Sequence, residues 1–151
     1  MKAIHLLCVG KLKDSHLEAL EKDYLKRITN PPLFIHEVKA SAENKVAEAE
    51  AIEKKLKELG DSSLCLIALT EWGKTYTSVE FSGWLEGQIQ QFSKVCFIIA
   101  GAEGFDADLL ARMNAKVSLS HLTFPHKLAR LIAVEQIYRA QTIRSGHPYH
   151  N

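Results

Sequence analysis

The segment Val95-Cys-Phe-Ile-Ile99-Ala-Gly-Ala-Glu-Gly104 is a short apolar run that ends in a turn of small residues. It predicts a buried strand over 95–99, and the pattern after the turn predicts a helix over 106–113. The same order of strand and helix repeats along the chain. We expect the other strands at 2–9, 33–38, 63–69 and 116–120, and the other helices at 15–27, 43–59, 78–91 and 125–144. This alternation is typical of an α/β fold in which a mostly parallel sheet has helices on both faces.

Size and composition indicate one ordinary globular domain over residues 1–151, because neither a linker nor an internal repeat interrupts the pattern. The net charge of +1 is unevenly distributed. Residues 121–151 carry four Lys or Arg and one acid, so they contribute +3 and the rest of the chain −2. This charge permits a nucleic-acid partner at the C-terminal segment but does not demand one. A solvated basic helix end, favoured by the helix dipole, explains it equally well.

The first ten residues form an apolar run that is too short for a signal sequence or a membrane span. We therefore expect a cytoplasmic protein without a membrane partner. Cys8, Cys65 and Cys96 are odd in number and each lies within an apolar run, which predicts thiols in the core.

Four of the seven histidines lie near the C-terminus, but their spacing does not predict a metal site. His121 and His126 are five positions apart, and His147 and His150 are three apart. Neither pair matches a known ligand pattern such as His-Glu-x-x-His. We expect no metal cofactor.

The C-terminal segment 119–151 combines a helix start with many polar side chains. Thr123 is a candidate N-cap, and Pro125 suits a first helical turn. A helix needs few hydrogen-bond donors of its own, so their abundance predicts that something anionic or polar docks here. The donors are Lys127, Arg130, Tyr138, Arg139, Arg144, Tyr149 and the four histidines.

In open parallel sheets, ligands bind beyond the carboxyl ends of the strands, which directs attention to three loops. The turn 100–104 would let a ligand approach the backbone, although a tight turn between strand and helix explains it as well. It lacks the dinucleotide fingerprint and the Lys-Ser/Thr of a P-loop, which disfavours NAD and ATP. Residues 70–74 place a carboxylate, an indole and an amine near the same edge, although an exposed turn that Gly73 makes possible explains them as well. Residues 120–124 offer backbone groups beside Leu122 and Phe124, a combination that suits a flat ligand such as adenine.

Five motifs together resemble the RlmH (YbeA-type) family of SPOUT methyltransferases. They are Val9-Gly-Lys-Leu-Lys13, Ile98-Ile-Ala-Gly-Ala-Glu-Gly104, Leu119-Ser-His-Leu-Thr-Phe-Pro-His126, Glu135-Gln-Ile-Tyr-Arg-Ala140 and Pro148-Tyr-His150. The resemblance covers the whole chain. It implies methylation of N3 of a pseudouridine in 23S ribosomal RNA, with S-adenosylmethionine as the methyl donor. It also implies a homodimer whose active site is completed near the subunit boundary, and a C-terminal trefoil knot, which general rules of chain topology would not predict.

Carried onto this chain, the family's cofactor pocket is built from the three loops identified above. The implied cofactor-binding residues are Leu69, Ala100, Gly101, Gly104, Leu119, Ser120, His121, Leu122, Thr123 and Phe124. The family usually has Gly-Gly where this chain has Ala100-Gly101, and often Gln in place of Lys127. The extra methyl group of Ala100 is expected to narrow the pocket, so cofactor affinity is the property that this difference affects.

The implied catalytic residues are His150, Arg139, Tyr149 and His126. An imide nitrogen must lose its proton before it can attack a methyl group, and His150 is the first candidate for the base, followed by His126. Arg139 would stabilise the resulting anion or hold a phosphate, and Tyr149 would stack on the target base or hydrogen-bond to it. Two simpler explanations compete: Arg139 and Glu135 pair along one helix, and His150 is a frayed terminal residue.

Two other functions compete with this one. A non-catalytic RNA- or nucleotide-binding module would keep the basic segment without using a methyl donor. A methyltransferase of the same fold that acts on transfer RNA would differ only in substrate. A chain of 151 residues has no room for an added RNA-binding domain, which favours a large structured target such as an assembled ribosome.

Overall fold

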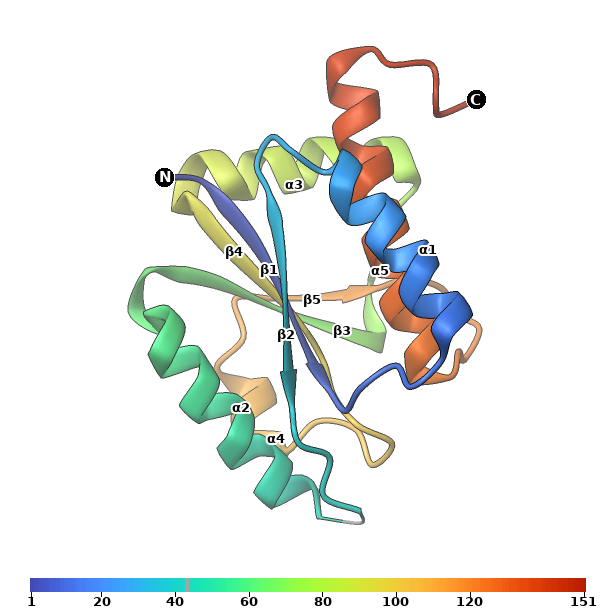
Figure 1. Cartoon of the computed structure of the whole chain (residues 1–151). Helices are drawn as coiled ribbons and strands as arrows, with labels where there is room; N and C mark the ends of the chain where they lie inside the picture. The colour runs from blue at the N-terminus through green and yellow to red at the C-terminus, as the bar shows by residue number, and fades with distance from the viewer. Residues whose placement is uncertain (43) are drawn as a thin grey trace.

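The computed structural model describes residues 1–42 and 44–151. Strands and helices alternate from one end of the chain to the other (Figure 1). In chain order they are β1 (Ala3–Val9), α1 (Ser15–Arg27), β2 (Leu33–Val38), α2 (Lys45–Leu59), the short 3₁₀ turn η1 (Asp61–Ser63), β3 (Leu64–Thr75), α3 (Ser78–Phe92), β4 (Lys94–Ile99), α4 (Ala107–Ala111), β5 (Ala115–Ser118) and α5 (His126–Ser145).

The five strands form one parallel sheet in the order β2-β1-β4-β3-β5. Helices α1, α3 and α5 cover one face, and α2 and α4 cover the other (Figure 1). Alternate residues of β1 serve the two faces: Leu6 packs with the first group of helices and Leu7 with the second. The predicted α/β class with helices on both faces is confirmed.

Most element boundaries agree with the sequence prediction within one or two residues. The predicted helix over 15–27 and the predicted strand over 33–38 match the structure. The helix expected at 43–59 begins at Lys45, with Asn44 as its N-cap, and Glu43 lies outside the described residues. The strand expected at 116–120 ends at Ser118, so residues 119 and 120 join the loop that precedes α5.

Strand β3 differs from the prediction, because it continues past Leu69 to Thr75. Leu69 and Lys74 both pair with Val117 of β5, so residues 70–73 bulge out of the ladder. At Gly73, a Cβ atom would lie 2.6 Å from backbone atoms of Lys116 and Val117. The interpretation of Gly73 as the residue of an exposed turn is therefore wrong. Glycine is needed here because the backbone of β5 passes too close for a side chain.

Thr123 does not cap α5 as predicted. Pro125 is the N-cap residue, and no side-chain hydrogen bond caps this end. The Thr123 hydroxyl instead donates to a carboxylate oxygen of Glu71. Pro125, with its fixed φ, sets where the helix starts, so the Thr123 hydroxyl is not used as a cap and can hydrogen-bond to Glu71.

Arg130 holds the fold together and does not face an outside partner, contrary to the expectation for the C-terminal donors. Its guanidinium donates to both carboxylate oxygens of Glu21 on α1, at 2.7 and 2.9 Å, and to Glu37 on β2 at 2.6 Å. Burial lowers the pKa of Arg130, but its hydrogen bonds to these two carboxylates outweigh that effect and raise the pKa above its ordinary value. The triad fixes α5 against α1 and the edge of the sheet.

The three cysteines are buried free thiols, as predicted. Burial raises the pKa of Cys8 and of Cys96 to about 12 and that of Cys65 to about 11. These thiols are unsuited to nucleophilic catalysis. None of the helices in the described part of the chain is both long and apolar enough to span a membrane.

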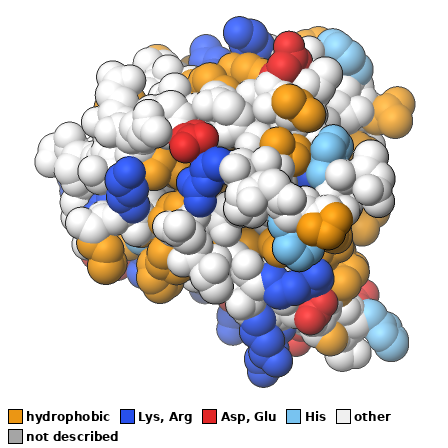
Figure 2. All heavy atoms as spheres, turned by 90° about the horizontal axis from the view of Figure 1, so that it is seen from above, with side chains coloured by type: hydrophobic (Ala, Val, Ile, Leu, Met, Phe, Trp, Pro, Cys, Tyr) orange, Lys and Arg blue, Asp and Glu red, His pale blue; other side chains and the backbone are white. Residues whose placement is uncertain are grey.

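Figure 2 shows the side of the molecule that carries α3 and the end of α5. Lys and Arg side chains stand there in several separate groups, with hydrophobic and histidine side chains between them. Positive charge is thus spread over this face and is not gathered into one stripe.

Candidate active site

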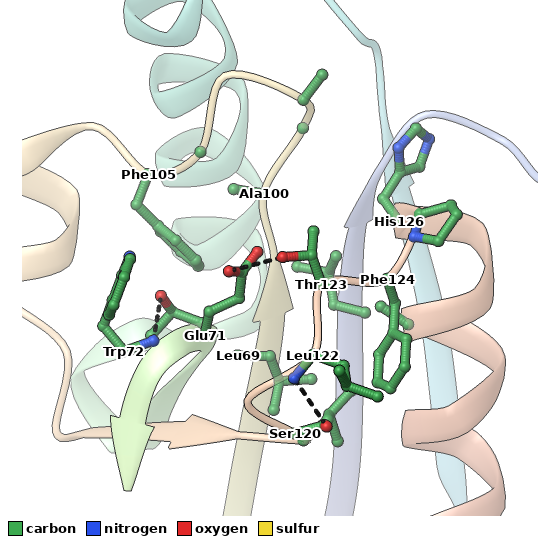
Figure 3. Close-up of a pocket in the computed structure, with 18 of the residues that line it drawn as sticks. Leu69, Glu71, Trp72, Ala100, Phe105, Ser120, Leu122, Thr123, Phe124 and His126 are labelled. Atoms are coloured by element: carbon green, nitrogen blue, oxygen red, sulfur yellow. Dashed lines mark hydrogen bonds between the residues drawn. The ribbon is translucent and has the colours of Figure 1, made fainter.

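A cavity of about 570 Å³ lies beside the bulge of β3 and beyond the carboxyl ends of β4 and β5 (Figure 3). Its walls come from the β3 bulge, the turn after β4 and the loop that leads from β5 into α5. These are the three loops that the sequence singled out, and this edge of a parallel sheet is where ligands usually bind. The lining residues are Leu69, Thr70, Glu71, Trp72, Ile99, Ala100, Gly101, Ala102, Gly104, Phe105, Leu110, Leu119, Ser120, Leu122, Thr123, Phe124, Pro125, His126 and Ala129.

Nine of the ten expected cofactor-binding residues line this cavity: Leu69, Ala100, Gly101, Gly104, Leu119, Ser120, Leu122, Thr123 and Phe124. The tenth, His121, is not among the lining residues and is exposed. The turn around it explains this, since the backbone N–H of Leu122 donates to Ser120 Oγ at 3.0 Å. Such a tight turn leaves the middle residue on the outside.

Phe105 is a wall residue that the sequence analysis missed. It comes from the turn between β4 and α4, and Figure 3 shows its ring on the same side of the cavity as Trp72. Its position directly after Gly104 was the available signal, because an apolar residue following a small-residue turn at a strand end is placed to face a ligand.

The two sides of the cavity are joined by a hydrogen bond. Thr123 Oγ1 donates to Glu71 Oε2 at 3.0 Å, which ties the loop before α5 to the β3 bulge (Figure 3). Trp72 and Leu122 stand nearby at the rim, with 90% and 71% of their surface exposed. The rim is therefore unusually apolar for an exposed surface.

Unpaired backbone groups accompany these apolar walls. The N–H groups of Gly101, Ala102 and Thr123 donate no hydrogen bond to other described residues. Apolar surface beside free amides suits a flat heterocycle with a polar edge. The described residues contain no cluster of three or more His, Cys, Asp or Glu that would hold a metal ion.

The other expected catalytic residues form a cluster at the far end of α5. Arg139 Nε donates to Glu135 Oε1 at 2.9 Å, and the hydroxyl of Tyr149 donates to the same oxygen at 3.0 Å. Arg139 Nη1 lies 3.0 Å from His150 Nδ1, and its guanidinium lies over the Tyr149 ring, 4.8 Å from the centroid. Tyr24 of α1 anchors the cluster through its hydroxyl, 3.3 Å from that of Tyr149.

These contacts test the two simpler explanations, that Arg139 pairs with Glu135 along the helix and that His150 is frayed. Arg139 does pair with Glu135, and this hydrogen bond raises the pKa of Arg139 above its ordinary value. His150 is not frayed, because it is held by Arg139 and partly buried. Burial, followed by the hydrogen bonds to Tyr24 and Glu135, raises the pKa of Tyr149, so its hydroxyl stays protonated.

The hydrogen bond between Arg139 and His150 also sets the state of the imidazole. A guanidinium only donates, so His150 Nδ1 accepts, and the neutral ring carries its proton on Nε2. A general base needs a free lone pair. In this arrangement the lone pair on Nδ1 is occupied, and it would be free to accept a proton only if Arg139 turned to another acceptor.

The structure does not bring the four expected catalytic residues together within one chain. His126 lines the cavity at the first turn of α5. Arg139 is thirteen residues further along the same helix, which corresponds to about 20 Å. Within a single subunit, Arg139, Tyr149 and His150 are too far from the cavity to act there.

Comparison with known proteins identifies the family of this chain. The family model described as "Predicted SPOUT methyltransferase" matches residues 1–150. Three similar proteins all bear the name ribosomal RNA large subunit methyltransferase H. The one from Gluconacetobacter diazotrophicus is 39% identical, and the alignment covers 97% of this chain and 96% of the relative. Those from Synechococcus sp. (strain CC9605) and Streptococcus uberis are 43% and 38% identical, with 96% and 97% of this chain and 94% and 98% of the relatives covered. The resemblance inferred from the motifs is confirmed: this chain belongs to the SPOUT methyltransferase family.

Proposed function

We propose that this methyltransferase transfers a methyl group from S-adenosylmethionine to N3 of a pseudouridine in 23S ribosomal RNA, within the assembled ribosome. The observation that carries the proposal is the cavity itself, because nine of the ten residues that the family resemblance implies line it together. The relatives' shared name supports ribosomal RNA as the substrate. The protein would act as a single-domain cytoplasmic homodimer with a trefoil knot.

The cavity suits the donor in size and chemistry. A volume of about 570 Å³ lies within the usual range for small-molecule sites. Leu122 and Phe124 would pack against an adenine ring, and the amides of Gly101 and Thr123 would bind its polar edges or the amino-acid part. The sulfonium of S-adenosylmethionine supplies an electrophilic methyl group.

The catalytic cluster would reach that methyl group from a second subunit. About 20 Å of helix separates Arg139 from its own cavity, so the cluster contributes only where two subunits meet. A homodimer that places the C-terminal end of one chain at the cavity of the other would bring His150 and His126 together. The RNA would bind along this boundary, where the cavity and the cluster meet.

The protein then has two tasks, to place the target nitrogen in line with the methyl group and to remove its proton. Arg139 would turn from His150 to the uracil oxygen beside N3, where negative charge develops as the proton leaves. This frees the lone pair on His150 Nδ1 to take the proton. Glu135 would hold the guanidinium through its hydrogen bond with Arg139 Nε while Arg139 changes acceptor. The Tyr149 ring would pack against the same guanidinium.

The first experiment measures transfer of a labelled methyl group to ribosomes that lack the modification, with the product nucleoside identified by mass spectrometry. Formation of 3-methylpseudouridine supports the whole proposal. Methyl transfer to transfer RNA but not to ribosomes would show that transfer RNA is the substrate instead. Absence of any binding of S-adenosylmethionine would favour a non-catalytic RNA-binding module.

A set of variants tests the proposed roles. Loss of a general base should slow turnover by roughly 10²–10⁴-fold, so His150→Ala and Arg139→Ala should fall in that range while donor affinity stays near wild type. His126→Ala should show whether the histidine in the cavity shares the task. Wild-type turnover in both His150→Ala and Arg139→Ala would remove the cluster from the mechanism.

A further inference from the structure

Glu48, on the inner side of α2, has a buried carboxylate that the mechanism above does not use. Only 6% of the residue is exposed. Its Oε2 accepts a hydrogen bond from the backbone N–H of Ser41 at 3.0 Å. Its Oε1 is buried and has no hydrogen-bond partner among the described residues. A buried acceptor without a hydrogen bond lowers the stability of the fold, so it often indicates a functional role.

This carboxylate lies directly behind the turn 100–104 of the cavity wall. A Cβ atom on Gly101 would be 2.5 Å from Glu48 Oε1 and 2.9 Å from Oε2. A side chain at Gly101 would therefore require the Glu48 carboxylate to move. The close approach also puts an acceptor without a donor beside a turn whose Gly101 and Ala102 amides donate to no other described residue.

We propose that Glu48 is a positioning residue for the methyl donor. When the donor occupies the cavity and takes the N–H of Gly101, the turn 100–104 shifts slightly, and the N–H of Ala102 donates to Glu48 Oε1. The carboxylate then accepts one hydrogen bond from Ser41 and one from the turn, so that it clamps the cavity wall to α2. This inference rests on the proposed function, since it assumes that the cavity binds S-adenosylmethionine.

The chemistry explains why a carboxylate is used. A glutamine side chain has one oxygen and one NH₂ group, so it serves Ser41 or the turn, but not both. Glu48→Gln should therefore keep the fold and the Ser41 contact while losing the new hydrogen bond. Glu48→Met removes both acceptors together with the unpaired buried oxygen, so the thermal stability of the free protein should fall little.

The test measures binding of S-adenosylhomocysteine by calorimetry and thermal unfolding with and without this ligand. Both Glu48 variants should bind about tenfold more weakly or worse, the loss expected for a hydrogen bond to a charged group, with free-protein Tm values close to wild type. The control Glu50→Gln changes an exposed carboxylate on the same helix and should bind normally. Amide hydrogen exchange at residues 101–102 should slow on ligand binding in the wild type and not in the variants.

Three results would overturn the inference. Wild-type affinity in both Glu48 variants would show that the carboxylate does not act on the donor. A large drop in free-protein Tm, with normal affinity in the fraction that stays folded, would make Glu48 a structural residue only. Failure of the wild-type protein to bind S-adenosylhomocysteine would instead remove the proposed function, and this inference with it.

Discussion

Thr123 and Glu71 lie 52 positions apart in the chain, yet their side chains meet across the cavity, with Thr123 Oγ1 donating to Glu71 Oε2 at 3.0 Å. The contact joins the β3 bulge to the loop before α5. Both groups are exposed, so the bond adds little to overall stability, and its main effect is on the shape of the cavity rim.

Thr123→Val should therefore weaken binding of S-adenosylmethionine, because the two walls are no longer held at a fixed separation. The free energy of unfolding should change by less than about 1 kcal/mol. Calorimetric titration and chemical denaturation measure the two quantities. Thr123→Ser keeps the hydroxyl and serves as the control, and equal affinities for the valine and serine variants would contradict the prediction.

Ala100→Gly should tighten donor binding, since it removes the methyl group that distinguishes this turn from the Gly-Gly of the family and that lines the cavity. The added backbone freedom should lower the free energy of unfolding by about 0.4–1 kcal/mol. The measurement is the Kd for S-adenosylhomocysteine beside a denaturation curve. An unchanged or larger Kd would show that the methyl group does not restrict the pocket.

Gly73→Ala should destabilise the protein by about 1–3 kcal/mol or more, because its Cβ would lie 2.6 Å from the backbone of β5. Gly83→Ala is the matched control. Gly83 is in the exposed part of α3, and nothing lies within 4 Å of its added Cβ, so this change should stabilise the helix by about 1 kcal/mol. The measurement is the Tm of both variants. A wild-type Tm for Gly73→Ala would argue against the close approach of the β3 and β5 backbones at this residue.

Arg130→Met should cost about 3–5 kcal/mol of stability, because it leaves the buried carboxylate of Glu21 without a counter-charge. Changing Glu21 to Met as well should recover most of the loss, since the uncompensated charge is then gone. Arg112→Met is the control. Its pairs with Glu53 and Asp61 are partly exposed, so about 1 kcal/mol or less is expected. A small effect of Arg130→Met in urea denaturation would contradict a structural role.

Stability should fall as the pH drops from about 6.5 towards 4. His5 Nδ1 lies 2.9 Å from His36 Nε2 across β1 and β2. Burial, helped by His36 and Lys94, lowers the pKa of His5 to about 4, and burial, helped by Lys55, also lowers the pKa of His36. In this pH window the unfolded chain binds protons that the folded protein does not, so acid favours unfolding.

His5→Gln should flatten that pH dependence, because it removes a group that is protonated in this pH window in the unfolded chain and not in the folded protein. The check is the free energy of unfolding measured at several pH values between 4 and 7. The same series on the exposed His16→Gln should keep the wild-type slope. An identical slope in the His5 variant would place the acid sensitivity elsewhere.

Much of the site was predictable because its parts are local in sequence. The turn 100–104 follows an apolar strand, and parallel strands bring their carboxyl ends to one edge, so the pattern of strands and helices was enough to place three loops together. Side-chain partners were not predictable in this way. Thr123 was expected to cap a helix and instead bonds to Glu71, a residue 52 positions away. Arg130 was expected to face a partner and is instead buried against Glu21.

The sequence by itself determined the order of strands and helices, the α/β class and the family, because periodicity and contiguous motifs are properties of neighbouring residues. Only the tertiary structure decided that Gly73 crosses β5, that Glu48 lies behind Gly101, and that Arg139 and His150 are distant from their own cavity. Each of these depends on which distant segments meet when the sheet and helices pack. Several different packings satisfy the same local pattern, so the residue brought to each contact follows from the fold as a whole.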